Sequence, residues 1–165
     1  MNIIINNKCD SIIAAGGGKV LDAGKYLAEI SSIPCITVPL SASTCAGWTA
    51  LSNIYTINGQ FIKDVQLRSC PKILVFDHQF IQTAPIKTLA SGIADALAKW
   101  YESSLTSSQI NDGLVQQAIQ ISRVLRDQIL IDGEKAFENP SEECLSWRNI
   151  ICLLYTSPSP RDIMR

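Results

Sequence analysis

The stretch Ser11–Lys25, SIIAAGGGKVLDAGK, decides the fold, because three successive glycines join a short apolar run to a helical pattern. Ile12 and Ile13, followed by small residues, indicate the end of a buried strand. The helix that opens with Lys19 has a predicted packed face of four apolar residues: Val20, Leu21, Ala23 and Leu27. Strand, glycine turn and helix in this order are the local plan of a phosphate-binding unit.

The physical basis of such a unit is the first turn of the helix, which leaves backbone N–H groups unpaired at the positive end of the helix dipole. Gly16, Gly17 and Gly18 would let the main chain come close to a pyrophosphate. Their spacing is not the GxGxxG fingerprint, and a glycine turn can also serve only to reverse the chain tightly. Both interpretations stay open at this point.

Size and charge restrict the class of protein. The 165 residues have the length of one domain, and a hydrophobic content of 47% is enough for a core. A formal net charge of -1, without runs of like charge, gives no argument for a nucleic-acid or acidic-membrane partner. No run of about 18 apolar residues and no signal-peptide pattern occurs, so we predict a cytoplasmic location by default.

The six cysteines contain no CxxC pair, which argues against a zinc knuckle or a redox motif. Their mostly apolar, strand-like neighbours favour buried free thiols of a reducing compartment. His78 is the only histidine, and we predict that it is a polar loop residue. This chain alone therefore cannot complete a metal site built from several histidines.

The next segment is predicted to place polar groups at the carboxyl edge of the sheet. Residues 33–39, bounded by two prolines, indicate a second buried strand in a parallel βαβ unit, and residues 40–56 indicate a loop that runs into a strand. Ligands of open α/β sheets bind at this edge, so Ser41, Ser43 and Thr44 are candidates for cofactor contact. The alternative is that these hydroxyls satisfy the backbone of the loop.

Two further strand signals follow. Asn58-Gly59, between the runs 51–56 and 61–65, predicts a hairpin whose tight turn needs positive backbone angles at both positions. Residues 73–76, ILVF, indicate another buried strand closed by Asp77.

From Pro85 onward the pattern becomes helical. Apolar residues recur at helical spacing in two groups, namely Leu89, Ile93, Leu97 and Trp100, and then Leu114, Ala118, Ile121 and Leu125. The chain thus passes from an α/β half to an all-helical half near residues 83–85. Asp95 lies on a face of small residues that leaves room for a metal ion or substrate, or it is a solvated aspartate paired with Lys99.

Three stretches in this order, GGGKVLDAGK, VPLSASTCAGWTALSNIYT and SGIADALAKWYE, resemble the iron-containing alcohol dehydrogenase superfamily and, within it, the glycerol dehydrogenase-like branch. The resemblance is close from Cys9 to about Glu102. It implies an α/β fold class, with a partial Rossmann-like nucleotide-binding domain in residues 1–84 and the first helices of an all-helical domain in residues 85–151. It also implies NAD or NADP, a divalent metal (zinc or iron) in the cleft between the domains, a small-molecule substrate, and homo-oligomeric full-length members.

Site residues are implied by matching positions. The motif GGGKxxDxxK assigns the pyrophosphate to Gly17, Gly18 and Lys19 and adds Asp22 to the cofactor-binding set. The nicotinamide side would be lined by four residues: Ser43, Thr49, Leu51 and Tyr55. Asp95 matches the aspartate metal ligand of the family, whose other ligands are two histidines further along the helical domain that this chain does not contain.

The implied reaction is hydride transfer between the nicotinamide and a small alcohol, polyol or 2-hydroxy acid, with the metal as a Lewis acid. Glycerol dehydrogenases have an aspartate where this chain has Cys45, so removal of that charge would favour a 2-oxo or 2-hydroxy acid, as in hydroxycarboxylate dehydrogenase-like members. The alternatives are a glycerol dehydrogenase proper, a nucleotide-binding module without catalysis, and a small helical interaction protein.

Both ends of the chain look cut, because family members carry further strands ahead of the glycine turn. We therefore expect a fragment that is inactive alone. The tail from Cys152 to Asp162, CLLYTSPSPRD, resembles the translation of a transposase adapter used in shotgun library preparation. We treat residues 152–165 as a non-native tail and predict that it is loose.

Overall fold

The computed structural model describes residues 2–106 and 112–156, which form two compact units. The first unit comprises residues 1–40 and 46–77, and the second comprises residues 41–45 and 78–165. The predicted domain boundary between residues 84 and 85 stays a prediction. Each unit is described by itself.

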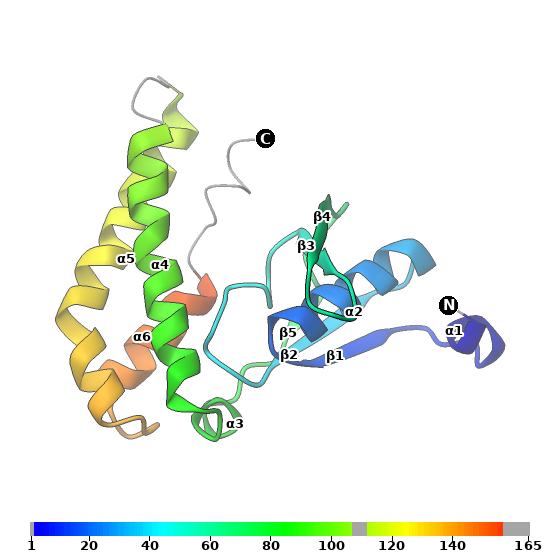
Figure 1. Ribbon diagram of the computed structural model, residues 1–165, viewed down its shortest axis with the longest axis horizontal. Coiled ribbons are helices and arrows are strands. Elements are labelled where there is room, and N and C mark those ends of the chain that lie inside the picture. Colours follow the sequence, from blue (N-terminus) through cyan, green and yellow to red (C-terminus); the bar gives the residue numbers. More distant parts are fainter. Residues whose placement is uncertain (1, 107–111, 157–165) are drawn as a thin grey trace. The chain divides into compact units, whose positions relative to one another are not determined.

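The first unit contains a parallel three-stranded sheet with the order β1-β2-β5 (Figure 1). Its elements are α1 (Asn2–Asn6), β1 (Ile12–Gly16), α2 (Gly18–Ser31), β2 (Cys35–Pro39), β3 (Leu51–Tyr55), β4 (Phe61–Gln66) and β5 (Ile73–Leu74). In the register of the sheet, Ile12 pairs with Cys35 and Gly16 with Pro39. The predicted strand, glycine turn, helix and second parallel strand are thus confirmed.

Helix α2 packs closely on β1 through a face that differs from the predicted one. Leu21 and Ala28 are buried in the core, but Val20 is 49% exposed and Leu27 is 37% exposed. Gly24 also faces the sheet, because a Cβ atom there would lie 2.3 Å from the Cβ of Ala14. The prediction for Val20, Ala23 and Leu27 is wrong, since the buried face of α2 includes a charged pair that an apolar count does not detect.

Strands β3 and β4 form the predicted antiparallel hairpin, in which Leu51 pairs with Gln66. Its turn is closed by the amide of Gly59 donating to the carbonyl of Thr56 at 2.9 Å. Gly59 has a φ of +81°, whereas Asn58 keeps a negative φ. The prediction of positive angles at both positions is therefore wrong, because the loop is longer than a two-residue turn and needs only one left-handed residue.

The strand predicted at residues 73–76 is shorter than expected. β5 contains only Ile73 and Leu74, and Ile73 and Val75 are exposed. Among the described residues β5 pairs only with β2, so one side of it lacks a covering strand. His78 is the first residue of a short helix, α3 (His78–Gln82), and not a loop residue as predicted.

The second unit is helical apart from residues 41–45, and Figure 1 shows α4 running alongside α5. Its longer helices are α4 (Ile86–Thr106), α5 (Gly113–Glu138) and α6 (Leu145–Thr156). Asp112 caps α5 by accepting the amides of Leu114 and Val115. Leu125 is buried as predicted, but Leu114 is 73% exposed, because the buried face of α5 runs through positions 122, 125, 129, 132 and 136.

The prediction of a loose tail is wrong for residues 152–156, because α6 continues as far as Thr156. Leu154 and Tyr155 are buried there, and the burial of these side chains stabilises the last turns of the helix, which come before the Ser/Pro run that begins at Ser157. The remaining tail residues, 157–165, lie outside the described residues. In the ranges that the structure describes, no helix has both the length and the apolar content needed to cross a membrane.

Candidate functional site

The glycine turn places backbone amides at the carboxyl end of β1. Gly16 has a φ of +157°, and a Cβ atom there would lie 2.8 Å from the Cβ of Val20. Gly17 is the N-cap of α2 in an extended conformation and offers no side-chain cap. Its carbonyl accepts the amides of Val20 and Leu21 at 2.9 and 3.1 Å. The amides of Gly18 and Lys19 precede the first possible intrahelical acceptor, which is the geometry that holds anions at helix N-termini.

Lys19 and Tyr55, two of the predicted cofactor residues, are in contact with each other. The Nζ atom of Lys19 lies 5.1 Å from the centroid of the Tyr55 ring, in a cation–π contact. Tyr55 also contacts Phe61 edge-on, with ring centroids 5.9 Å apart. The Lys19 Nζ would lie 3.1 Å from a Cβ atom at Gly59, so the hairpin tip reaches the first turn of α2.

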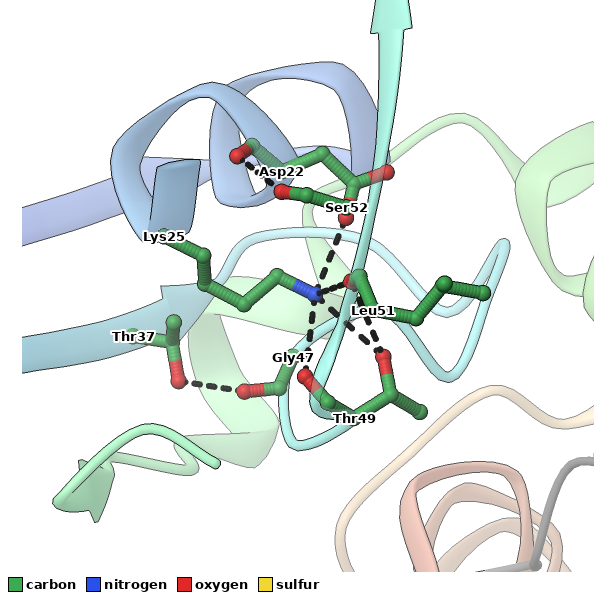
Figure 2. A network of polar contacts seen from close by, with 7 residues as sticks. All are labelled: Asp22, Lys25, Thr37, Gly47, Thr49, Leu51 and Ser52. Carbon is green, nitrogen blue, oxygen red and sulfur yellow. Dashed lines mark hydrogen bonds and ion pairs between the residues drawn. The ribbon is translucent and has the colours of Figure 1, made fainter. Parts of the chain in front are cut away.

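A buried ion pair lies one turn further along α2. The Nζ atom of Lys25 is 2.9 Å from Oδ1 of Asp22, and the two side chains are 1% and 6% exposed. Figure 2 shows that the same Nζ also points at the segment that enters β3. There it donates to the Leu51 carbonyl at 2.5 Å and to the carbonyl and hydroxyl of Thr49, both at 3.2 Å.

Two opposing effects act on the pKa of Asp22 in this ion pair. Burial raises the pKa of the Asp22 carboxyl, while the charge and hydrogen bond of Lys25 act in the opposite direction. The hydroxyl of Ser52 donates to the backbone carbonyl of Asp22 at 2.5 Å, which adds a second link between α2 and β3. A further link joins β2 to the same loop, since the hydroxyl of Thr37 donates to the carbonyl of Gly47 at 2.5 Å.

Within the second unit, residues 41–45 pack against α4. A Cβ atom at Gly92 would lie only 1.9 Å from the carbonyl oxygen of Ala42, so glycine allows the close approach. The hydroxyls of Ser43 and Ser41 lie 3.2 Å apart and share a hydrogen bond. Cys45 is a buried free thiol. The Ser41 and Ser43 hydroxyls thus pair with each other, and both interpretations of this segment, cofactor contact and satisfaction of the loop backbone, stay predictions.

Asp95 lies on the outer part of α4, and its side chain is 52% exposed. Its Oδ2 is 3.6 Å from the Nζ of Lys99, so the predicted ion pair is present. Among residues 2–106 and 112–156, no three His, Cys, Asp or Glu side chains lie close enough to hold a metal ion. The metal role of Asp95 therefore stays a prediction.

The structure thus brings together only some of the predicted site residues. In the first unit, Gly17, Gly18 and Lys19 form the turn and the start of α2, and Tyr55 contacts Lys19. Asp22, Thr49 and Leu51 surround the Nζ of Lys25. In the second unit, Ser43 and Cys45 lie in the 41–45 segment. The sequence analysis missed the role of Lys25. Its spacing from Asp22 is a detectable signal, because residues three apart on a helix face each other and Lys25 shares the face of Leu21 and Ala28.

Comparisons with known proteins agree with this architecture. The family model of iron-containing alcohol dehydrogenases matches residues 1–78. An uncharacterized oxidoreductase of Synechocystis is 44% identical over 142 residues, which are 86% of this chain and 36% of that protein. A glycerol dehydrogenase of Pseudomonas putida is 36% identical over 79% of this chain and 37% of its own length. Hydroxycarboxylate dehydrogenase A of Escherichia coli is 33% identical over 82% of this chain and 38% of its own length.

Among solved structures, a probable glycerol dehydrogenase of Sinorhizobium meliloti superposes with a TM-score of 0.85 at 25% identity. The match covers 98% of this chain and 48% of that one. The predicted resemblance to iron-containing alcohol dehydrogenases and the predicted fold class are confirmed. The chain spans less than half the length of the relatives and the structure reported above.

Proposed function

We propose that this chain is the nucleotide-binding part, with the first helices of the catalytic domain, of a metal-dependent dehydrogenase that uses NAD or NADP. The observation that carries the proposal is the glycine turn. It ends a parallel strand, opens α2 without a side-chain cap, and is followed directly by Lys19 in the first turn of the helix. A pyrophosphate bound there would accept the amides of Gly18 and Lys19 and would neutralise the Lys19 charge.

The nicotinamide side of the cofactor is proposed to contact Ser43, Thr49, Leu51 and Tyr55. Support comes from the three residues in the first unit, because Thr49 and Leu51 are tied to α2 through Lys25, and Tyr55 lies beside Lys19. A rigid segment beside the phosphate turn is suited to orienting a nicotinamide ring, since hydride transfer depends on the alignment of the reacting carbons. Asp22 belongs to the same motif and lies within this network.

A divalent zinc or iron ion is proposed to bind Asp95. The exposed carboxylate fits a hard or borderline divalent cation, and the two histidine ligands that the resemblance implies are not among the residues of this chain. When bound, such a metal lowers the pKa of a substrate hydroxyl as a Lewis acid. Within this chain, Lys99 holds the Asp95 carboxylate by an ion pair that a metal would have to compete with or displace.

The substrate is proposed to be a small alcohol, polyol or 2-hydroxy acid. Cys45, the residue that replaces the aspartate of glycerol dehydrogenases, is buried and uncharged as a thiol, so it offers no carboxylate to hydrogen-bond a polyol. This favours a 2-oxo or 2-hydroxy acid over glycerol. A glycerol dehydrogenase proper is the alternative, and relatives of both kinds match the chain.

The test uses a full-length protein that carries this chain and spans the length of its relatives, loaded with zinc or iron. We expect NAD(P)-dependent reduction of 2-oxo acids with a higher kcat/KM than the oxidation of glycerol, and loss of turnover after chelation of the metal. Cys45→Asp should shift the preference toward glycerol, whereas Cys45→Ser, which adds no charge, should not. Failure of the loaded protein to turn over any of these substrate classes would overturn the proposal.

A nucleotide-binding module without catalysis is the second candidate, favoured by the compactness of the first unit. It predicts measurable NAD(H) binding by this chain alone and no turnover by the full-length protein. A dehydrogenase fragment instead predicts weak or no binding by this chain, together with turnover by the full-length protein.

A further inference from the structure

Lys25 has no part in the proposed reaction, yet its ammonium is buried and fully engaged. Of its four acceptor atoms, Asp22 Oδ1 lies on α2, and the other three belong to residues 49 and 51. Two of those three are backbone carbonyls. A buried ammonium that donates hydrogen bonds to main-chain carbonyls fixes the path of the backbone there, and not only the position of a side chain.

The two ends of this contact are the two predicted halves of the cofactor site. On α2, Lys25 lies two turns after the glycine turn, on a helix whose first residues carry the proposed pyrophosphate site. At the other end of the contact, Thr49 precedes β3 and Leu51 is its first residue, and this strand ends at Tyr55. The Ser52 hydroxyl strengthens the same junction from the opposite direction, because it donates to a carbonyl of α2.

The roles of the two charges in this junction differ. The carbonyls of Thr49 and Leu51 need hydrogen-bond donors at this depth, and the Lys25 ammonium supplies them together with its positive charge. A buried cation without a counterion is costly, and the Asp22 carboxylate supplies that counterion at 2.9 Å. The Asp22 carboxylate is thus already paired with a charge of the protein itself.

We propose that Lys25 is a positioning residue that holds the segment 49–52 in register with the glycine turn, and that Asp22 is its counterion and not a ligand of the cofactor. The inference rests on the proposed function for the identity of the two halves. The mechanical coupling itself is a property of this chain and can be measured without any cofactor.

The first experiment is hydrogen exchange on this chain, with peptides that separate residues 49–55 from β1 and β2. The double variant Asp22→Asn with Lys25→Met removes the junction without leaving a single buried charge, so it is more suitable than Lys25→Met alone. We expect at least tenfold faster exchange in residues 51–55 and unchanged exchange in β1 and β2. The matched control is the double variant Arg123→Met with Asp127→Asn, which removes an exposed ion pair. It should change neither the exchange of residues 51–55 nor that of β1 and β2.

Unchanged exchange in residues 51–55 would overturn the proposal, and so would an equal increase in β1 and β2, since that is the signature of general destabilisation.

The second experiment measures the affinity for NADH and for ADP-ribose in the full-length protein used to test the proposed function. ADP-ribose carries the pyrophosphate but lacks the nicotinamide, so the double variant should lose about tenfold or more in NADH affinity while its ADP-ribose affinity changes less than about twofold. Equal losses of affinity for NADH and ADP-ribose would mean that Lys25 contributes only to overall stability, and the positioning role would be overturned. A wild-type protein that binds neither ligand would contradict the proposed function, and the exchange measurement would then decide the role of Lys25 by itself.

Discussion

The carbonyl oxygen of Ala42 would lie 1.9 Å from a Cβ atom at Gly92, so α4 and the 41–45 segment meet with no room for even a methyl group. Gly92 lies three residues before Asp95 on the same helix, and Ala42 lies next to Ser43. This one close approach therefore joins a predicted cofactor segment to the helix that carries the predicted metal ligand, within a single compact unit.

Gly92→Ala should destabilise the helical unit, because the Ala42 carbonyl is backbone and cannot move away cheaply. We expect the free energy of unfolding to fall by about 1–3 kcal/mol, the usual cost of overpacking. Urea denaturation followed by circular dichroism measures it. Gly113→Ala is the matched control, since a Cβ at Gly113 meets nothing within 4 Å. A change of less than about 1 kcal/mol is expected there. Equal effects of the two substitutions would contradict the packing argument.

Gly24→Ala tests the packing of α2 on the sheet. A Cβ at this position would lie 2.3 Å from the Cβ of Ala14, so helix and strand must separate to admit it. We expect a loss of about 1–3 kcal/mol despite the higher helix propensity of alanine. Combining it with Ala14→Gly should recover part of the loss. An additive double variant, measured in the same urea titration, would show that the two positions do not meet.

Removing one partner of the buried ion pair should lower the free energy of unfolding more than removing both. Lys25→Met leaves Asp22 charged and unpaired in the interior, for which we expect a loss of about 3–5 kcal/mol. The double variant Asp22→Asn with Lys25→Met should be more stable than Lys25→Met. If the single and double variants unfold at the same denaturant concentration, the charge of Asp22 is not what destabilises the single variant.

The contact between Lys19 and Tyr55 should contribute modestly to stability. A double-mutant cycle with Lys19→Met and Tyr55→Leu is expected to give a coupling energy of about 0.5–1 kcal/mol at this partly exposed site. Tyr55→Phe keeps the aromatic face and should preserve most of the coupling. A coupling energy of zero in thermal unfolding would mean that the hairpin tip and the first turn of α2 are independent in solution.

Acid should weaken the helical unit through Asp132. This buried carboxylate of α5 accepts hydrogen bonds from Asn149 and Ser146, both at 2.8 Å, and from Gln128 at 2.6 Å, and the bonds from Asn149 and Ser146 are the main cause of its lowered pKa. A carboxyl group whose pKa is lower in the folded state contributes stability above its unfolded pKa of 3.8 and loses it as the pH falls through the folded value.

Stability measured by urea unfolding should therefore drop below about pH 4. The substitution Asp132→Asn should remove that part of the drop, because its side chain does not titrate. An identical pH profile for the two proteins would assign the acid sensitivity to other groups.

The sequence by itself determined the elements whose signals are local. Glycines between an apolar run and an amphipathic run specify strand, turn and helix, and Asn58-Gly59 specifies a hairpin, because the backbone angles that these residues permit do not depend on distant contacts. The motif order also predicted the resemblance to iron-containing alcohol dehydrogenases, which the match over residues 1–78 confirms.

Only the tertiary structure decided which side of each helix is buried and which polar residues face one another. Asp22 and Lys25 lie on the buried face of α2, whereas Val20 is exposed. The carbonyls of residues 49 and 51, which are 24 and 26 residues further along the chain than Lys25, supply the acceptors that make burial of a lysine possible. Hydrophobic periodicity cannot predict the burial of such a lysine, because it counts apolar side chains on one element. It carries no information about the distant hydrogen-bond partners that offset the cost of burying the charge.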